Sequence, residues 1–109
     1  MYTDFELFEM ASNSQKKVFV SNVTMSIPDD ADGCVDLDAE KKRLGTIWRA
    51  AQMSLRDMVD ATGLSQRAFG QSVGIPMRTV QNWCAGINSC PLYTRFLLAE
   101  HYGLFEKQK

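Results

Sequence analysis

The sequence predicts a mainly α-helical protein, folded as a compact bundle of about five short helices behind a different N-terminal segment. Three observations favour this fold class. Apolar residues recur at spacings of three and four from residue 38 onward. Serine or proline precedes these segments, and glycine follows several of them. The chain has 109 residues, of which 45% are hydrophobic and 23% charged, as expected of one small globular protein.

Residues 1–43 form an acidic segment outside the predicted bundle. The stretch "DFELFEMA" (4–11) has the pattern of a short amphipathic helix. The stretch "KKVFVSNVTMSI" (16–27) is rich in β-branched residues and predicts one strand or a loose hairpin. The stretch "PDDADGCVD" (28–36) is typical of an acidic, turn-rich linker.

The first helix of the bundle is expected over residues 39–53, because apolar side chains repeat along one face. A second helix is expected to begin after Ser54, since "SLRD" places an acid three residues after a serine in a capping-box pattern. Gly63 is expected to end this helix. The predicted inward residues are Leu44, Ile47, Trp48 and Ala51 in the first helix, and Leu55, Met58, Val59 and Thr62 in the second.

Three further helices complete the bundle. Ser65 is expected to cap the third helix, which turns Phe69 and Val73 inward. Pro76 opens the fourth helix, which turns Val80 and Trp83 inward and stops at Gly86. Pro91 opens the fifth, "LYTRFLLAEHYG", which Gly103 closes.

The third and fourth helices are separated by only a few residues. Gly74 can adopt a positive φ, which allows the chain to turn sharply after Val73. Pro76 cannot continue an upstream helix but suits the first turn of the next one. Gly70 has no side chain, so two helices can cross closely at this point, and Ile75 is an apolar anchor under the turn. The pattern predicts a helix–tight turn–helix unit.

These residues carry a resemblance to the phage-repressor-like (Xre-type) helix-turn-helix domain of bacterial and phage proteins. The resemblance covers residues 44–105. Within this family, the chain resembles a subset of small bacterial proteins of uncharacterised role. It implies a DNA-binding domain at 44–105, with residues 106–109 as a tail. Cys84 departs from the family, which usually has Glu at this position. The matching positions are Phe69, Gly70, Val73, Gly74, Ile75, Val80 and Trp83.

The resemblance implies that the helix after the turn enters the DNA major groove. The residues on its polar side have suitable chemistry, since Arg pairs with guanine and Asn or Gln with adenine, while Met77 can contact a thymine methyl group. The alternative for this face is an ordinary solvated helix surface. The expected base contacts are Met77, Arg78, Gln81 and Asn82, and the expected backbone contacts are Gln66, Arg67 and Thr79.

The net charge of −1 conceals an asymmetry between the two parts of the chain. Residues 1–43 contain nine acidic and five basic side chains, a net charge of −4. Residues 44–109 contain four acidic and seven basic side chains, a net charge of +3. This distribution fits a nucleic-acid-binding part joined to an acidic part, and it equally fits a mildly basic solvated surface.

The sequence contains no catalytic motif, and no cofactor or metal is expected. Three cysteines without C-x-x-C spacing, together with the single His101, match no usual zinc pattern, so three reduced thiols are expected. No stretch is long and apolar enough to span a membrane, and the acidic N-terminus lacks the basic start of a secretory signal. We therefore expect a cytoplasmic protein that is not an enzyme. The cysteines are Cys34, Cys84 and Cys90.

The last predicted helix is apolar nearly all round, so several elements must cover it. Two arrangements satisfy this requirement: a homodimer joined near Tyr93 and Leu97, or residues 1–53 folded back over the helix. A dimer would also pair two recognition helices on half-sites of duplex DNA. The sequence therefore predicts a dimeric, sequence-specific transcription regulator. The alternative is an antitoxin or adaptor that holds a protein partner through residues 1–43.

Overall fold

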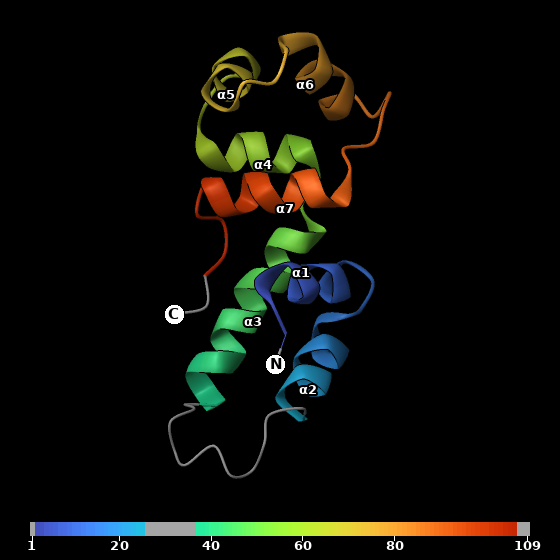
Figure 1. Cartoon of the computed structure of the whole chain (residues 1–109), viewed down its shortest axis with the longest axis vertical. Helices are drawn as coiled ribbons and strands as arrows, with labels where there is room; N and C mark the ends of the chain where they lie inside the picture. Colours follow the sequence, from blue (N-terminus) through green and yellow to red (C-terminus); the bar gives the residue numbers. More distant parts are fainter. Residues whose placement is uncertain (1, 26–36, 107–109) are drawn as a thin grey trace. The chain divides into compact units, whose positions relative to one another are not determined.

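The computed structural model describes residues 2–25 and 37–106, and in these residues the secondary structure is entirely helical. The predicted mainly α-helical class is confirmed. Within the described residues there are seven helices, whereas the sequence predicted five in the bundle and a short one at 4–11 before it. The predicted linker at 28–36 lies outside these residues. The helices are α1 (Asp4–Ser12), α2 (Lys16–Met25), α3 (Leu37–Gln52), α4 (Leu55–Thr62), α5 (Gln66–Val73), α6 (Met77–Cys84) and α7 (Leu92–His101) (Figure 1).

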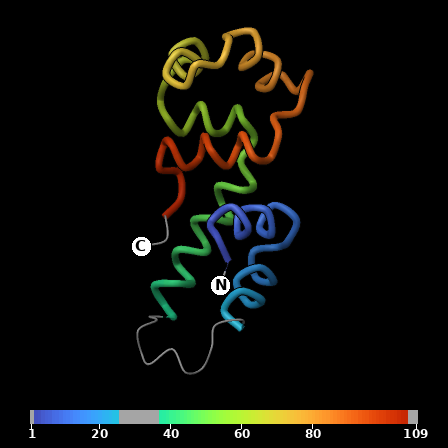
Figure 2. The backbone as a smooth tube through the Cα atoms, in the orientation of Figure 1, coloured from blue at the N-terminus to red at the C-terminus, as the bar shows by residue number. Residues whose placement is uncertain are grey.

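The chain divides into two compact units. Figure 2 traces the backbone, coloured from the N-terminus to the C-terminus. Unit 1 comprises Met1–Gln52 together with Phe105–Lys109, and unit 2 comprises Met53–Leu104. The sequence predicted one domain over residues 44–105, whereas in the structure residues 44–52 belong to unit 1, together with α1 and α2. The reason is that α3 is one continuous helix, whose apolar side packs against α1 and α2.

The core of unit 1 forms where α1 and α2 pack against α3. Phe105, just beyond α7 in the sequence, also packs here, with its ring centroid 6.4 Å from that of Phe8. The other buried side chains of this core include Leu7, Phe19, Val23, Leu44 and Ile47.

The predicted strand or hairpin in residues 16–27 is wrong, because Lys16–Met25 forms helix α2. Phe19 and Val23, four residues apart, are both buried, whereas Val18 is exposed. This spacing places one apolar side of a helix against the rest of unit 1. Burial therefore outweighs the local β preference of the valine-rich sequence.

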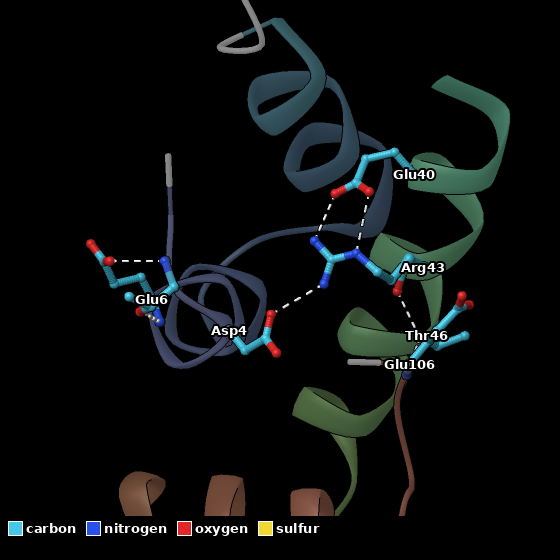
Figure 3. Close-up of polar contacts among 7 residues, drawn as sticks. Asp4, Glu6, Glu40, Arg43, Thr46 and Glu106 are labelled. Carbon is cyan, nitrogen blue, oxygen red and sulfur yellow. Dashed lines mark hydrogen bonds and ion pairs between the residues drawn. The ribbon is translucent and has the colours of Figure 1, made fainter. Parts of the chain in front are cut away.

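An ion-pair cluster also joins α1 to α3 (Figure 3). The Arg43 guanidinium is buried and donates to Glu40 Oε1 at 2.6 Å and to Asp4 Oδ1 at 3.1 Å. Burial alone would lower the pKa of Arg43, but the hydrogen bonds and charges of Glu40 and Asp4 outweigh it and raise this pKa. The cluster therefore keeps Arg43 charged inside unit 1.

Two further side chains of α3 bind the C-terminal end of α1 and the turn after it. Trp48 Nε1 donates to the carbonyl oxygen of Ser14 at 2.9 Å, and Gln52 Nε2 donates to that of Ala11 at 2.8 Å. Carbonyl groups at a helix C-terminus lack partners within the helix. The bond from Gln52 adds a second partner to one such carbonyl, that of Ala11, and the two bonds together fix the position of the turn between α1 and α2 along α3.

Unit 2 contains α4 to α7, and α4, α5 and α6 pack on one another. The predicted capping box of α4 is confirmed, since Ser54 and Asp57 exchange side-chain to backbone hydrogen bonds. Ser65 likewise caps α5 by accepting from the N–H of Ala68. The buried apolar side chains of these three helices are Leu55, Met58, Val59, Phe69 and Val80.

Helix α7 is connected to the rest of unit 2 at both ends. Near its start, Arg95 donates to the carbonyl oxygen of Met53 at 2.9 Å. At its end, the Tyr102 ring stacks on Phe69 with centroids 5.0 Å apart, and its hydroxyl hydrogen-bonds to Ser72. Tyr102 therefore links the end of α7 to α5.

Candidate nucleic-acid interface

The connection between α5 and α6 has the geometry that the glycines predicted. Gly74 has φ 74° and ends α5, and the chain resumes as α6 after Ile75 and Pro76. The N–H of Ile75 donates to the carbonyl oxygen of Gly70 at 2.9 Å. A Cβ atom on Gly70 would lie 2.6 Å from the Ile75 carbonyl oxygen, so a side chain there would displace the connection. The close approach predicted at Gly70 and the positive φ predicted at Gly74 are both confirmed.

The N-terminal end of α6 has no side-chain cap. The N–H groups of Thr79 and Val80 bond to the Pro76 carbonyl, as the first turn of a helix requires. The preceding N–H groups, those of Met77 and Arg78, have no acceptor among the described residues. Uncapped donors at a helix N-terminus attract anions, because their partial positive charges add to the helix dipole.

Helix α6 has a buried side and a polar side. Val80 is fully buried, and Trp83 and Cys84 are half-buried, although Trp83 was expected to belong to the core. Met77, Arg78 and Gln81 are exposed. These three residues form an exposed surface at spacings of one, three and four along the helix.

Asn82 and Thr79 are less accessible than the other predicted contact residues, since both are half-buried. The Asn82 carbonyl oxygen accepts hydrogen bonds from the N–H groups of Ile87 and Asn88, at 3.0 and 3.4 Å. These bonds hold the segment after α6 against the end of that helix. Asn88 and Ser89 in this segment are exposed, and neither was among the predicted contact residues.

The two predicted contact residues on α5 lie in its first turn. Arg67 is exposed and Gln66 is half-buried. Their own N–H groups precede that of Ala68, which Ser65 caps, and have no acceptor among the described residues. The start of α5 therefore combines the exposed Arg67 cation with backbone donors.

No Asp or Glu occurs between Asp60 and Glu100, a stretch that includes the whole of α5 and α6. Arg67 and Arg78 are the exposed cations of this stretch. The third arginine, Arg95, is half-buried and bonds to Met53. No carboxylate close in the sequence therefore neutralises Arg67 at the start of α5 or Arg78 at the start of α6.

Two cysteines of unit 2 are free thiols, Cys84 and Cys90. Burial raises the pKa of Cys84, and the nearby Arg56 opposes this shift. Burial also raises the pKa of Cys90, to about 11, against a smaller effect of Arg95. Both thiols are thus neutral at physiological pH. Among the described residues, no three His, Cys, Asp or Glu side chains are grouped to hold a metal ion.

No family model matches the chain, and searches of curated proteins and of solved structures found no match. None of the helices within residues 2–25 and 37–106 is long and apolar enough to cross a membrane.

Proposed function

We propose that the protein is a sequence-specific regulator of transcription that binds duplex DNA through α5 and α6. The observation that carries the proposal is the exposed surface of Met77, Arg78 and Gln81 on α6, whose N-terminal donors are uncapped. This surface lies within a stretch without acidic residues. In the proposed complex, α6 is the recognition helix of a helix-turn-helix motif and lies in the major groove.

Arg78 has the principal role in reading the sequence, because an exposed guanidinium can donate to O6 and N7 of guanine together. Gln81, three residues further along the same surface, can pair with adenine. Asn82 is half-buried, so it reaches a base only at the edge of the interface. Arg67, Gln66 and Thr79 bind phosphates and fix the position of the motif on the duplex.

Selection of bound duplexes from a random pool, followed by affinity measurements at fixed salt, tests this function. Arg78→Ala should weaken the best site by about 1–3 kcal/mol and relax the preference at one base pair. Arg67→Ala should weaken all sequences to a similar extent. A protein whose affinity and sequence preference are unchanged by Arg78→Ala does not use α6 in this way.

The proposed DNA-binding form is a cytoplasmic homodimer joined through α7. Tyr93 and Leu97, four residues apart on this helix, are 56% and 43% exposed in the single chain. Four-residue spacing places them on the same side of α7, where a second copy can cover both. A two-fold dimer would present two α6 helices to half-sites about 34 Å apart on DNA.

A second candidate function is that of an antitoxin or adaptor, favoured by an exposed apolar surface on α2. Val18 and Met25, seven residues apart on this helix, are 47% and 80% exposed. Such a surface suits a helix or groove of a protein partner. If the protein has this function, a partner co-purifies with the full chain in fixed ratio. The partner is lost from a variant that carries both Val18→Lys and Met25→Lys, because these substitutions replace the exposed apolar side chains by charged ones.

A further inference from the structure

Unit 1 carries a group of cations around Gly45 that the proposed function does not use. The side chain of Lys16, from the start of α2, extends over α3 at this point. A Cβ atom on Gly45 would lie 3.5 Å from Lys16 Cε and 3.7 Å from Lys16 Nζ. The Lys16 ammonium group is therefore positioned beside the half-buried backbone of α3 at Gly45.

Three further cations lie next to Gly45 on α3 itself. Lys41 and Lys42 precede it by four and three residues, and Arg49 follows it by four. Residues at these spacings are neighbours on a helix surface. We call the surface formed by Lys16, Lys41, Lys42 and Arg49 around Gly45 the Gly45 face.

The cations of the Gly45 face are not neutralised within the described part of the chain. All four are exposed, and none forms an ion pair with a described carboxylate. Asp4 and Glu40 both bind Arg43, which is buried (Figure 3). Two other carboxylates lie close to the face. Asp38 is one turn before Lys42, and Glu106 is held beside α3 by the bond from its N–H to Thr46 Oγ1.

Gly45 itself has no packing role that the structure reveals. Glycine in the interior of a helix is less stable than alanine. At Gly45 an added Cβ would meet only the flexible end of Lys16, at an ordinary contact distance. The glycine is therefore not required for space, in contrast to Gly70. Its effect is to leave a half-buried section of helix backbone without a side chain among the four cations, next to the flexible end of Lys16.

We propose that the Gly45 face binds the phosphate backbone of duplex DNA, as a second contact surface in addition to that of α5 and α6. The inference rests on the proposed function for its choice of polyanion. The face is open and spread along two helices, and it lacks the buried polar side chains that enclose a small anion. Duplex DNA presents one negative charge per about 1.7 Å of its axis, so separate cations on an open surface can each contact a phosphate. Such contacts add affinity without sequence preference.

The test is the salt dependence of binding by the full chain to a labelled duplex of mixed sequence that lacks the selected site. Each phosphate contact contributes about −0.9 to the slope of log Kobs against log salt concentration. Lys42→Ala and Arg49→Ala should each reduce this slope by about 1, and the double variant by about 2. Lys17→Ala is the matched control, since it removes one exposed lysine from the start of α2 outside the Gly45 face. It should leave the slope unchanged.

A Gly45→Gln variant provides a second measurement. The glutamine side chain occupies space among the four cations and removes no charge, so this variant should weaken binding to the mixed-sequence duplex without lowering Tm. Circular dichroism of every variant establishes that the helices are intact.

Several outcomes overturn the inference. One is that Lys17→Ala changes the slope as much as Lys42→Ala, because the effect would then be one of net charge. Another is tighter binding of an RNA duplex than of a DNA duplex through the same four cations. If Arg78→Ala relaxes sequence preference while the Gly45-face variants match the control, only the inference fails. If the wild-type chain binds no duplex DNA, both the proposed function and the inference fail.

Discussion

The carbonyl oxygen of Ile75 lies 2.6 Å from the position that a Cβ atom would occupy on Gly70, closer than real Cβ atoms approach other heavy atoms. The same two residues are joined by the hydrogen bond from the Ile75 N–H to the Gly70 carbonyl oxygen, at 2.9 Å. The connection between α5 and α6 thus follows the backbone of α5 at van der Waals distance. Any side chain at residue 70 must separate the two helices on which the proposed DNA contact depends.

We predict that Gly70→Leu lowers the free energy of unfolding by about 1–3 kcal/mol, through overpacking against the Ile75 carbonyl and Val80. Urea unfolding followed by circular dichroism measures the loss. Gln71→Leu is the control, since it introduces the same side chain at an exposed position of the same helix and should change stability by less than about 0.5 kcal/mol. Equal stabilities for the two variants would contradict the packing described here.

The Arg43 cluster gives a prediction for unit 1. Removing one partner of a buried ion pair costs about 3–5 kcal/mol when the other partner is left fully buried. Asp4 and Glu40 retain contact with water, with side chains 17% and 28% exposed, so Arg43→Met should cost less, about 1–3 kcal/mol.

A double-mutant cycle isolates the Arg43–Asp4 interaction from other effects of substitution. Asp4→Asn and Arg43→Met should be less than additive, because each removes the same pair. Additive losses in urea unfolding would mean that the two residues do not interact in solution.

How far the sequence anticipated this structure depended on the distance between interacting residues. The Ser54–Asp57 capping box and the positive φ of Gly74 were predicted because each signal lies within four residues. The Asp4–Arg43 bond joins residues 39 positions apart, and no local spacing indicates it. The helix at Lys16–Met25 was missed for a related reason: its valines favour a strand locally, and only packing on α3 makes the helix preferable.

In the candidate nucleic-acid interface, too, local features could be predicted and contacts between distant segments could not. Exposure of Arg78 and Gln81 opposite the buried Val80 follows from helical periodicity, and the sequence predicted it. The half-burial of Asn82 could not be predicted in this way, because it depends on how the segment containing Ile87 and Asn88 returns to the end of α6. The Gly45 face was also missed, since Lys16 and Gly45 come from different helices.

We predict that the Cys90 thiol reacts slowly with disulfide reagents. Its pKa is raised by burial from an ordinary value of 9.0 to about 11, so near neutral pH its thiolate fraction should be about 100-fold lower than that of an unfolded cysteine. Reaction rates of a Cys34→Ser, Cys84→Ser variant, measured across pH in buffer and in urea, test this.

The sign of the associated pH dependence follows from the same shift. The folded state holds the Cys90 proton more tightly than the unfolded state does, so this contribution to stability is complete below pH 9. It is lost as pH rises from 9 toward about 11. A native Cys90 that reacts as fast as the unfolded chain at every pH would show that the thiol is accessible.

The proposed dimer through α7 predicts that Leu97→Lys produces a monomer, because a charge at the centre of an apolar contact is costly to bury. Multi-angle light scattering measures the mass. Ile87→Lys is the control: Ile87 is 71% exposed but lies outside α7, so its substitution should leave the dimer intact. A Leu97→Lys protein that remains dimeric would place the contact between copies elsewhere.

Phe105 has a consequence for how the chain unfolds. Unit 2 begins directly after α3 and ends directly before Phe105, whose ring packs with Phe8 in unit 1. While unit 1 is folded, both ends of residues 53–104 are therefore held, and the unfolded form of this segment is a closed loop instead of a free tail. Closing a loop removes conformational freedom from the unfolded ensemble, as a disulfide does. The contact of one phenylalanine with unit 1 thus acts as a noncovalent cross-link that stabilises a different part of the protein.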